Sequence, residues 1–163
     1  MHETDIPHGF LISAQDFVSV SADEFERALL APCSIATWNN LDLMAPANPR
    51  VPMDVGDAME FTVHVGPLSF DYVMIVACRT PGVSYVQRTT KGFVEVTIEY
   101  SWKSYGEGTL VTVDAMYRLT GSLRWKKTLT QMVARRFMRV AGRNMRDMFP
   151  AGGAAAKEAG PFS

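Results

Sequence analysis

The segment FVEVTIEYSWKSYGEGTLVTVDAMYRL, residues 93–119, decides the fold. It contains two runs in which apolar and polar side chains alternate, and the turn Gly106-Glu107-Gly108 separates them. Alternation with a period of two is typical of β-strands that bury one face, and a short glycine-containing turn between two such runs predicts a hairpin. The faces expected to be buried are Val94, Val96, Ile98, Tyr100 and Trp102 in the first run, and Val111, Val113, Ala115, Tyr117 and Leu119 in the second.

The residues that precede this hairpin show further strand patterns and two helix signals. Strands are predicted at residues 10–20, 41–44, 58–65, 69–79 and 83–90. Ser21 and Glu24 have the S-x-x-E spacing of a capping box, which predicts the start of a helix that ends at Pro32. A long proline-rich connection is expected over 32–56, with a second short helix at 35–38.

The last part of the chain, residues 122–149, has apolar residues at helical spacing and predicts one long amphipathic helix. The stripe expected to face the sheet is Leu129, Met132, Val133, Arg136, Phe137, Val140, Ala141, Asn144 and Met148. A single helix cannot cover both faces of six or seven strands, so the antiparallel sheet must twist and curl around it. The expected organisation is an α+β domain over 10–149, a flexible N-terminus over 1–9 and a disordered Ala/Gly-rich tail over 150–163.

Composition and charge exclude several classes of protein. A chain of 163 residues with 47% hydrophobic residues is long and apolar enough for one globular domain. No apolar run reaches the length of about 20 residues that a membrane span needs, and the first residues do not resemble a signal peptide. These observations predict a cytoplasmic protein in which Cys33 and Cys78 are free, buried thiols.

The charges are unevenly distributed along the chain. Residues 1–60 contain ten acidic and two basic residues, whereas residues 61–163 contain seven acidic and 14 basic residues. The acidic first third and the basic last third are expected to attract each other if they touch. This balance argues against a nucleic-acid-binding protein, whose domain is generally basic throughout. Contact between a membrane and the basic last helix is an alternative use of these charges.

The order of these elements resembles the START-like superfamily (SRPBCC), particularly its polyketide cyclase/dehydrase and lipid-transport group. The segments that carry the resemblance are 18–25, Trp38, Val55-Gly56-Asp57, Thr80-Pro81-Gly82 and 108–113. The resemblance covers residues 10–149 and implies a helix-grip fold, in which the curved sheet encloses an apolar cavity against the last helix. It implies a hydrophobic small-molecule ligand. The chain is expected to be a monomer or a homodimer.

No metal site, nucleophile motif or cofactor fingerprint occurs in the sequence, so any catalysis must rest on isolated polar groups in the cavity. Asp16 lies on the apolar face of its strand, where burial would raise the pKa of its carboxyl and suit it to acid/base catalysis. The alternatives for Asp16 are exposure to solvent or an ion pair with an arginine of the last helix. Tyr100 and Tyr117 are the other candidate catalytic groups, as hydroxyl donors to a substrate carbonyl, unless they only fill the core.

The candidate ligand-binding residues are expected on the inner face of the sheet or helix, or in the loop over the cavity, with the side of the strand left open for Tyr72 and Tyr85. They are Trp38, Phe61, Tyr72, Tyr85, Arg88, Trp102, Met132 and Phe137. Trp38 could stack on an aromatic ligand or simply anchor its loop, and Arg88 could hold an anionic group or remain solvated. The leading interpretation is a cyclase, aromatase or dehydratase for a polyketide-like molecule. The alternatives are a non-catalytic carrier of lipid or quinone, and an interaction module that assembles through its charged regions or an edge strand.

Overall fold

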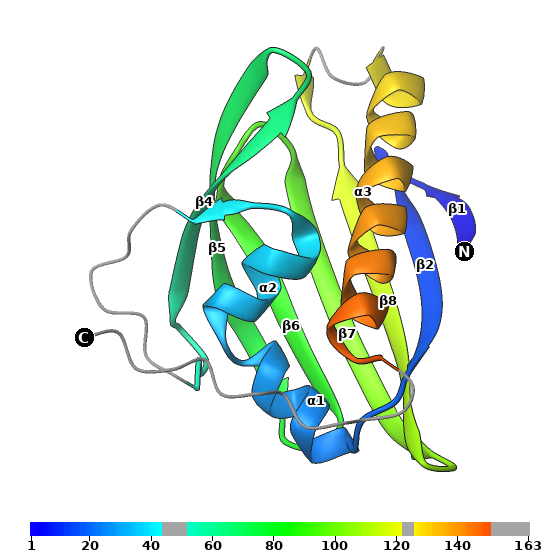
Figure 1. Ribbon diagram of the computed structural model, residues 1–163. Coiled ribbons are helices and arrows are strands. Elements are labelled where there is room, and N and C mark those ends of the chain that lie inside the picture. The colour runs from blue at the N-terminus through cyan, green and yellow to red at the C-terminus, as the bar shows by residue number, and fades with distance from the viewer. Residues whose placement is uncertain (44–51, 122–125, 151–163) are drawn as a thin grey trace.

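Figure 1 shows the computed structural model, which describes residues 1–43, 52–121 and 126–150. The described part contains one antiparallel sheet of eight strands in the order β1-β2-β8-β7-β6-β5-β4-β3. The strands are β1 (His2–Ile6), β2 (Gly9–Val18), β3 (Asp42–Leu43), β4 (Ala58–Val65), β5 (Leu68–Thr80), β6 (Ser84–Lys91), β7 (Glu95–Tyr105) and β8 (Gly108–Arg118). The helices are α1 (Ala22–Leu29), α2 (Pro32–Asn39) and α3 (Lys127–Met148).

All three helices lie on the same face of the sheet (Figure 1), and α3 packs against β2 and α2. The sheet bends partly because the pairing of β5 with β6 shifts register twice, between Val73 and Met74 and between Val76 and Cys78. Such irregularities increase the local twist of a sheet. The predicted α+β helix-grip architecture, a curved sheet around a C-terminal helix, is therefore confirmed.

The alternating pattern places the expected faces inward. Tyr100 and Trp102 in β7 are each 4% exposed, and Val111 and Ala115 in β8 are fully buried. The hairpin of residues 93–119 pairs Tyr100 with Val113 and Trp102 with Val111, so both apolar faces point to the same side. This alternation follows from the pleat, because successive side chains of a strand point to opposite faces.

The core at the end of the sheet near α1 is built around Phe25. The predicted capping box is present at the start of α1: the Glu24 amide donates to the Ser21 hydroxyl, and the Ser21 amide donates to the Glu24 carboxylate. This cap fixes the start of α1 and helps to direct Phe25 inward, where it is fully buried. Its ring stacks on Trp38 of α2 at 6.2 Å and meets Trp102 edge-on at 5.7 Å.

Three predictions about the chain's organisation differ from the structure. Residues 2–6, expected to be flexible, form β1, because their backbone pairs with β2. Pro32 does more than end the first helix: it occupies the first turn of α2, where its missing N–H is not needed. The two free cysteines, Cys33 and Cys78, are exposed rather than buried. The tail expected over 150–163 lies outside the described residues except for Pro150.

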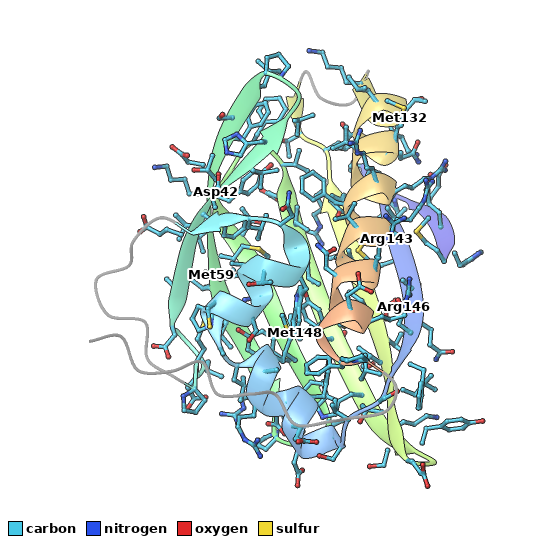
Figure 2. The ribbon with its side chains drawn as sticks, viewed as in Figure 1. Asp42, Met59, Met132, Arg143, Arg146 and Met148 are labelled. Carbon is cyan, nitrogen blue, oxygen red and sulfur yellow. The ribbon has the colours of Figure 1, made fainter. Side chains whose placement is uncertain are left out.

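The side of α3 that faces the sheet also differs from the predicted stripe. Met132 is 61% exposed and Leu129 is 54% exposed, whereas Ala134 and Met145 are each 3% exposed. Figure 2 shows Met132 near the start of α3, with its side chain directed away from the sheet. The buried face is therefore rotated by about one residue from the prediction, because apolar residues occur on more than one side of α3 and do not identify a single face.

The expected attraction between the acidic N-terminal third and the basic C-terminal part is confirmed. The Glu3 carboxylate of β1 accepts hydrogen bonds from Gln131 at 2.6 Å and from Arg135 at 2.5 Å. Asp5 pairs with Lys127 at 2.7 Å. These contacts, which bridge about 130 residues of sequence, connect the edge strand β1 to α3.

Candidate ligand-binding cavity

A cavity of about 290 Å³ lies between the first half of α3, the inner face of strands β4 to β8, and α2. Its walls are mainly apolar. The lining side chains are Ile35, Asn39, Leu41, Met59, Phe61, Val63, Val65, Leu68, Phe70, Tyr72, Met74, Gln87, Thr89, Phe93, Val94, Val96, Ile98, Tyr100, Tyr117, Lys126, Leu129, Thr130, Val133, Ala134, Phe137 and Met138.

The cavity reaches the surface where the β4–β5 hairpin, the β6–β7 turn and the first turn of α3 meet. Leu68, Phe93 and Leu129, one from each of these segments, line the cavity and are each more than half exposed. Phe93 stacks on Phe70 with ring centroids 4.8 Å apart, so one side of the mouth is aromatic. The mouth therefore presents an apolar surface to an entering molecule.

Several polar groups of the lining already have partners within the protein. The Tyr72 hydroxyl accepts from the Val94 amide at 3.3 Å. Thr89 both donates to the Val96 carbonyl and accepts from the Val96 amide, at 3.1 Å each. Gln87, only 2% exposed, donates from its amide nitrogen to the Tyr85 hydroxyl at 3.1 Å. These bonds satisfy polar groups that would otherwise be costly to bury, and they stiffen the cavity wall.

Tyr100 and Tyr117 supply hydroxyls to the cavity from neighbouring strands. Burial raises the pKa of Tyr100 above its ordinary value of 10.0, although hydrogen bonds with the side chains of Asn39 and Trp38 oppose this effect. Burial also raises the pKa of Tyr117, and the nearby Tyr100 and Tyr72 hydroxyls raise it further. Both groups therefore stay protonated at neutral pH and can donate a hydrogen bond, but neither serves as a ready base.

A second, smaller cavity of about 30 Å³ adjoins the large one. Asn39, Ile98, Tyr100 and Met138 line both cavities. Asp16 lines the small cavity and not the large one, and its carboxylate forms an ion pair with Arg146 of α3. Figure 2 shows Arg146 on α3, near the neighbouring strand β2. The ion pair with an arginine of the last helix, which the sequence left open as an alternative, is thus the arrangement that the structure shows.

The candidate binding residues fall into three groups in the structure. Phe61, Tyr72 and Phe137 line the large cavity, together with the two tyrosines proposed as catalytic. Trp38, Tyr85 and Trp102 are buried at 4% exposure or less but do not line it, because they belong to the packed core around Phe25. Trp38 lies in α2 rather than in a loop over the mouth.

The third group consists of Arg88 and Met132, whose predicted position at the cavity was wrong. Arg88 is exposed because it lies on the outer face of β6, one residue away from the inward-facing Gln87. Met132 is exposed because the buried face of α3 is rotated relative to the predicted stripe. Neither side chain lines the cavity.

Several polar lining residues, including Gln87 and Asn39, were not predicted from the sequence. Gln87 had a detectable signal, since it follows Tyr85 by two residues and must therefore share its face of the strand. Asn39 had none, because it reaches the cavity only through the packing of α2 against the sheet and α3.

In the described residues, no group of three or more histidine, cysteine, aspartate or glutamate side chains could hold a metal ion. Within the same part of the chain, no helix is both long and apolar enough to cross a bilayer.

Comparison with known proteins shows the fold of this chain. A START superfamily protein from Mycobacterium smegmatis superposes with a TM-score of 0.61 at 14% identity, over 85% of this chain and 98% of that one. Ginseng major latex-like protein 151 from Panax ginseng gives 0.62 at 11% identity, over 88% and 99%. DynU16, a protein of the dynemicin biosynthetic locus, gives 0.57 at 18% identity, over 86% of this chain and 48% of that one.

No family model and no curated protein matches the sequence. The structural similarity therefore defines the class of fold: the chain has the START-like helix-grip fold, as the order of its sequence motifs predicted.

Proposed function

We propose that this protein binds one hydrophobic small molecule, aromatic or polyketide-like, in the large cavity. The observation that carries the proposal is the cavity itself: about 290 Å³ of space with mainly apolar walls inside a folded domain. This volume is near the lower end of the range for small-molecule pockets, about 300–1,000 Å³. The apolar mouth formed by Leu68, Phe93 and Leu129 supports the same class of ligand.

The proposed chemistry is cyclisation or dehydration of a bound carbonyl compound. Tyr100 and Tyr117 would donate hydrogen bonds to a carbonyl or enolate oxygen, because their raised pKa values keep both hydroxyls protonated. The stiff wall around Gln87 and Thr89 would hold a flexible chain in one conformation, which itself accelerates ring closure.

A second candidate function, carriage of a lipid or quinone without chemistry, is favoured by one feature of the lining. Among the described residues that line the large cavity, none is a carboxylate or a histidine, the usual acids and bases of enzymes. A carrier requires only apolar walls and a few hydrogen-bonding groups. We place either activity in the cytoplasm, where the exposed thiols of Cys33 and Cys78 would stay reduced.

Two neighbouring residues of α3 provide a matched test of the binding site. Val133 lines the cavity, whereas Met132 is 61% exposed and does not. Val133→Trp should abolish binding of an apolar aromatic probe such as 1-anilinonaphthalene-8-sulfonate, measured by fluorescence and calorimetry, while Met132→Trp should bind as the parent does. Equal binding by the parent and both variants would refute the proposed site.

The two candidate functions differ in their dependence on the tyrosine hydroxyls. Native mass spectrometry of the protein purified from its own source would identify a retained molecule for use as a substrate. Tyr100→Phe and Tyr117→Phe should then stop turnover if the protein is an enzyme, and leave binding and release unchanged if it is a carrier.

A further inference from the structure

The small cavity differs from the large one in its chemistry. It is bounded by the Asp16 carboxylate at one side and by Tyr100 at the wall shared with the large cavity, with Asn39 and Trp38 beside them. Asp16 is 22% exposed and Arg146 is 50% exposed, so this end reaches solvent. Tyr100, by contrast, is 4% exposed. The small cavity therefore lies between a solvent-accessible carboxylate and a buried hydroxyl.

The space exists because the residues around it are small. A methyl group added at Gly142 would lie 2.6 Å from the Asp16 carboxylate oxygen Oδ2, so only glycine lets α3 approach this side chain so closely. Ala14 of β2 and Ala141 of α3 also line the space. A larger side chain at any of these positions would fill the gap between α3 and the sheet.

The space is large enough for water, and three polar groups interrupt its mainly apolar wall. A volume of about 30 Å³ has room for about two water molecules, at 10–15 Å³ each. A buried water needs two to four polar partners. Asp16 Oδ1 already accepts from Arg146, and the Asn39 nitrogen already donates to the Ile35 carbonyl. A water in this space would therefore contact the second Asp16 oxygen and the Tyr100 hydroxyl, which also bonds with the side chains of Asn39 and Trp38. The large cavity differs in one respect, because no carboxylate is among the described residues that line it.

We propose that the small cavity is a hydrated proton path that connects Tyr100 to solvent through Asp16. When Tyr100 gives its proton to a bound oxygen, its own oxygen accepts a proton from the adjacent water, and solvent replaces that proton at the Asp16 end. One proton enters for each proton transferred, so the charge of the site is unchanged. The use of this path in chemistry rests on the proposed function, whereas the path itself exists without a ligand.

The test measures exchange of the tyrosine hydroxyl protons in the ligand-free protein. In protein whose tyrosines carry ¹³C at Cζ, the NMR signal recorded in mixed H₂O/D₂O distinguishes a hydroxyl proton that exchanges slowly with solvent from one that exchanges quickly. Tyr100 should exchange faster than Tyr85, which is fully buried, bonded to Gln87 and outside both cavities. Asp16→Asn should slow the exchange of Tyr100 by about 100-fold, the low end of what a positioned acid or base contributes to proton transfer.

Two further variants make the result decisive. Ala141→Val should slow the exchange by filling the space while Asp16 remains. Asp114→Asn is the matched control, since Asp114 is a half-buried carboxylate paired with Ser13 on the opposite face of the sheet, and it should change nothing. Unchanged exchange in both Asp16→Asn and Ala141→Val would overturn the proton path. Failure of the parent to bind any apolar probe would instead refute the proposed function and leave the exchange result standing.

Discussion

Replacement of Phe25 by alanine should strongly destabilise the protein, because this ring joins four elements of the fold. Its ring contacts Trp38 of α2 at 6.2 Å, Trp102 of β7 at 5.7 Å and Phe149 after α3 at 6.3 Å. Phe25 itself lies in α1 and is fully buried. The loss would therefore loosen the packing between all three helices and the sheet.

The size of the effect follows from burial and ring contacts. Truncation of a buried phenylalanine to alanine costs about 3–5 kcal/mol, and each lost aromatic pair adds about 0.5–1.5 kcal/mol to what area alone explains. Three ring contacts place Phe25→Ala near 5 kcal/mol or about 10–20 °C in Tm for a chain of this length. Since many domains have a total stability of only about 5–15 kcal/mol, Phe25→Leu is the variant to use if Phe25→Ala does not fold.

The assay is urea and thermal unfolding followed by circular dichroism, with Phe17→Ala as the control. Phe17 is 44% exposed on the outer face of β2, so its truncation should cost less than about 1 kcal/mol. Equal destabilisation by Phe25→Ala and Phe17→Ala would refute the conclusion that the aromatic cluster around Phe25 holds the helices to the sheet.

Three further predictions concern ionisation, the cavity wall and the edge strand. Burial raises the pKa of Tyr72, Tyr85, Tyr100 and Tyr117 above the ordinary value of 10.0. Absorbance at 295 nm should therefore show that these four hydroxyls ionise at a higher pH in the folded protein than in the unfolded chain. A raised pKa stabilises the folded state, and this contribution is complete when the pH is below 10.0, the pKa of tyrosine in the unfolded chain. The free energy of unfolding should therefore fall as the pH rises above 10. A free energy of unfolding that stays constant up to pH 11 would contradict the burial of these hydroxyls. A methyl group at Gly92 would lie 2.3 Å from the Tyr72 ring, so Gly92→Ala should weaken probe binding. Gly106→Ala is the control: Gly106 has a φ of +58° and no neighbouring atom that a methyl group would meet, so this variant should lose about 1 kcal/mol of stability and bind the probe as the parent does. Glu3→Gln should speed hydrogen exchange at the backbone amides of β1 more than at those of β8, because it weakens the contacts with Gln131 and Arg135. Equal effects on the two strands would show that these contacts do not hold β1 against α3.

Prediction of the cavity residues succeeded where strand alternation was sufficient. Phe61, Tyr100 and Tyr117 line the cavity because each lies on the inward face of a strand whose alternation was visible in the sequence. Tyr72 also lines it, but its strand is apolar on both faces, so alternation did not indicate its side. The same rule, applied consistently to β6, excludes Arg88 and includes Gln87.

Prediction was less successful for helices and for charged groups. Met132 and Val133 are both apolar neighbours in α3, yet only Val133 faces the sheet. The role of Asp16 depended on Arg146, which lies 130 residues away in the sequence. No local pattern indicates which arginine of a basic helix will reach a particular carboxylate.

The amino-acid sequence alone determined the strands in residues 58–65 and 93–119, their inward faces and the capped start of α1, because these depend on a two-residue repeat and on local hydrogen bonds. The helix-grip class was predicted by the resemblance in the order of the sequence motifs. Only the tertiary structure decided which side of α3 meets the sheet, that residues 2–6 pair as a strand, and that Asp16 borders a separate small cavity. Those features arise from the fit between distant surfaces. A packed interior depends on the shapes of all its neighbours together, and short-range patterns carry no information about that fit.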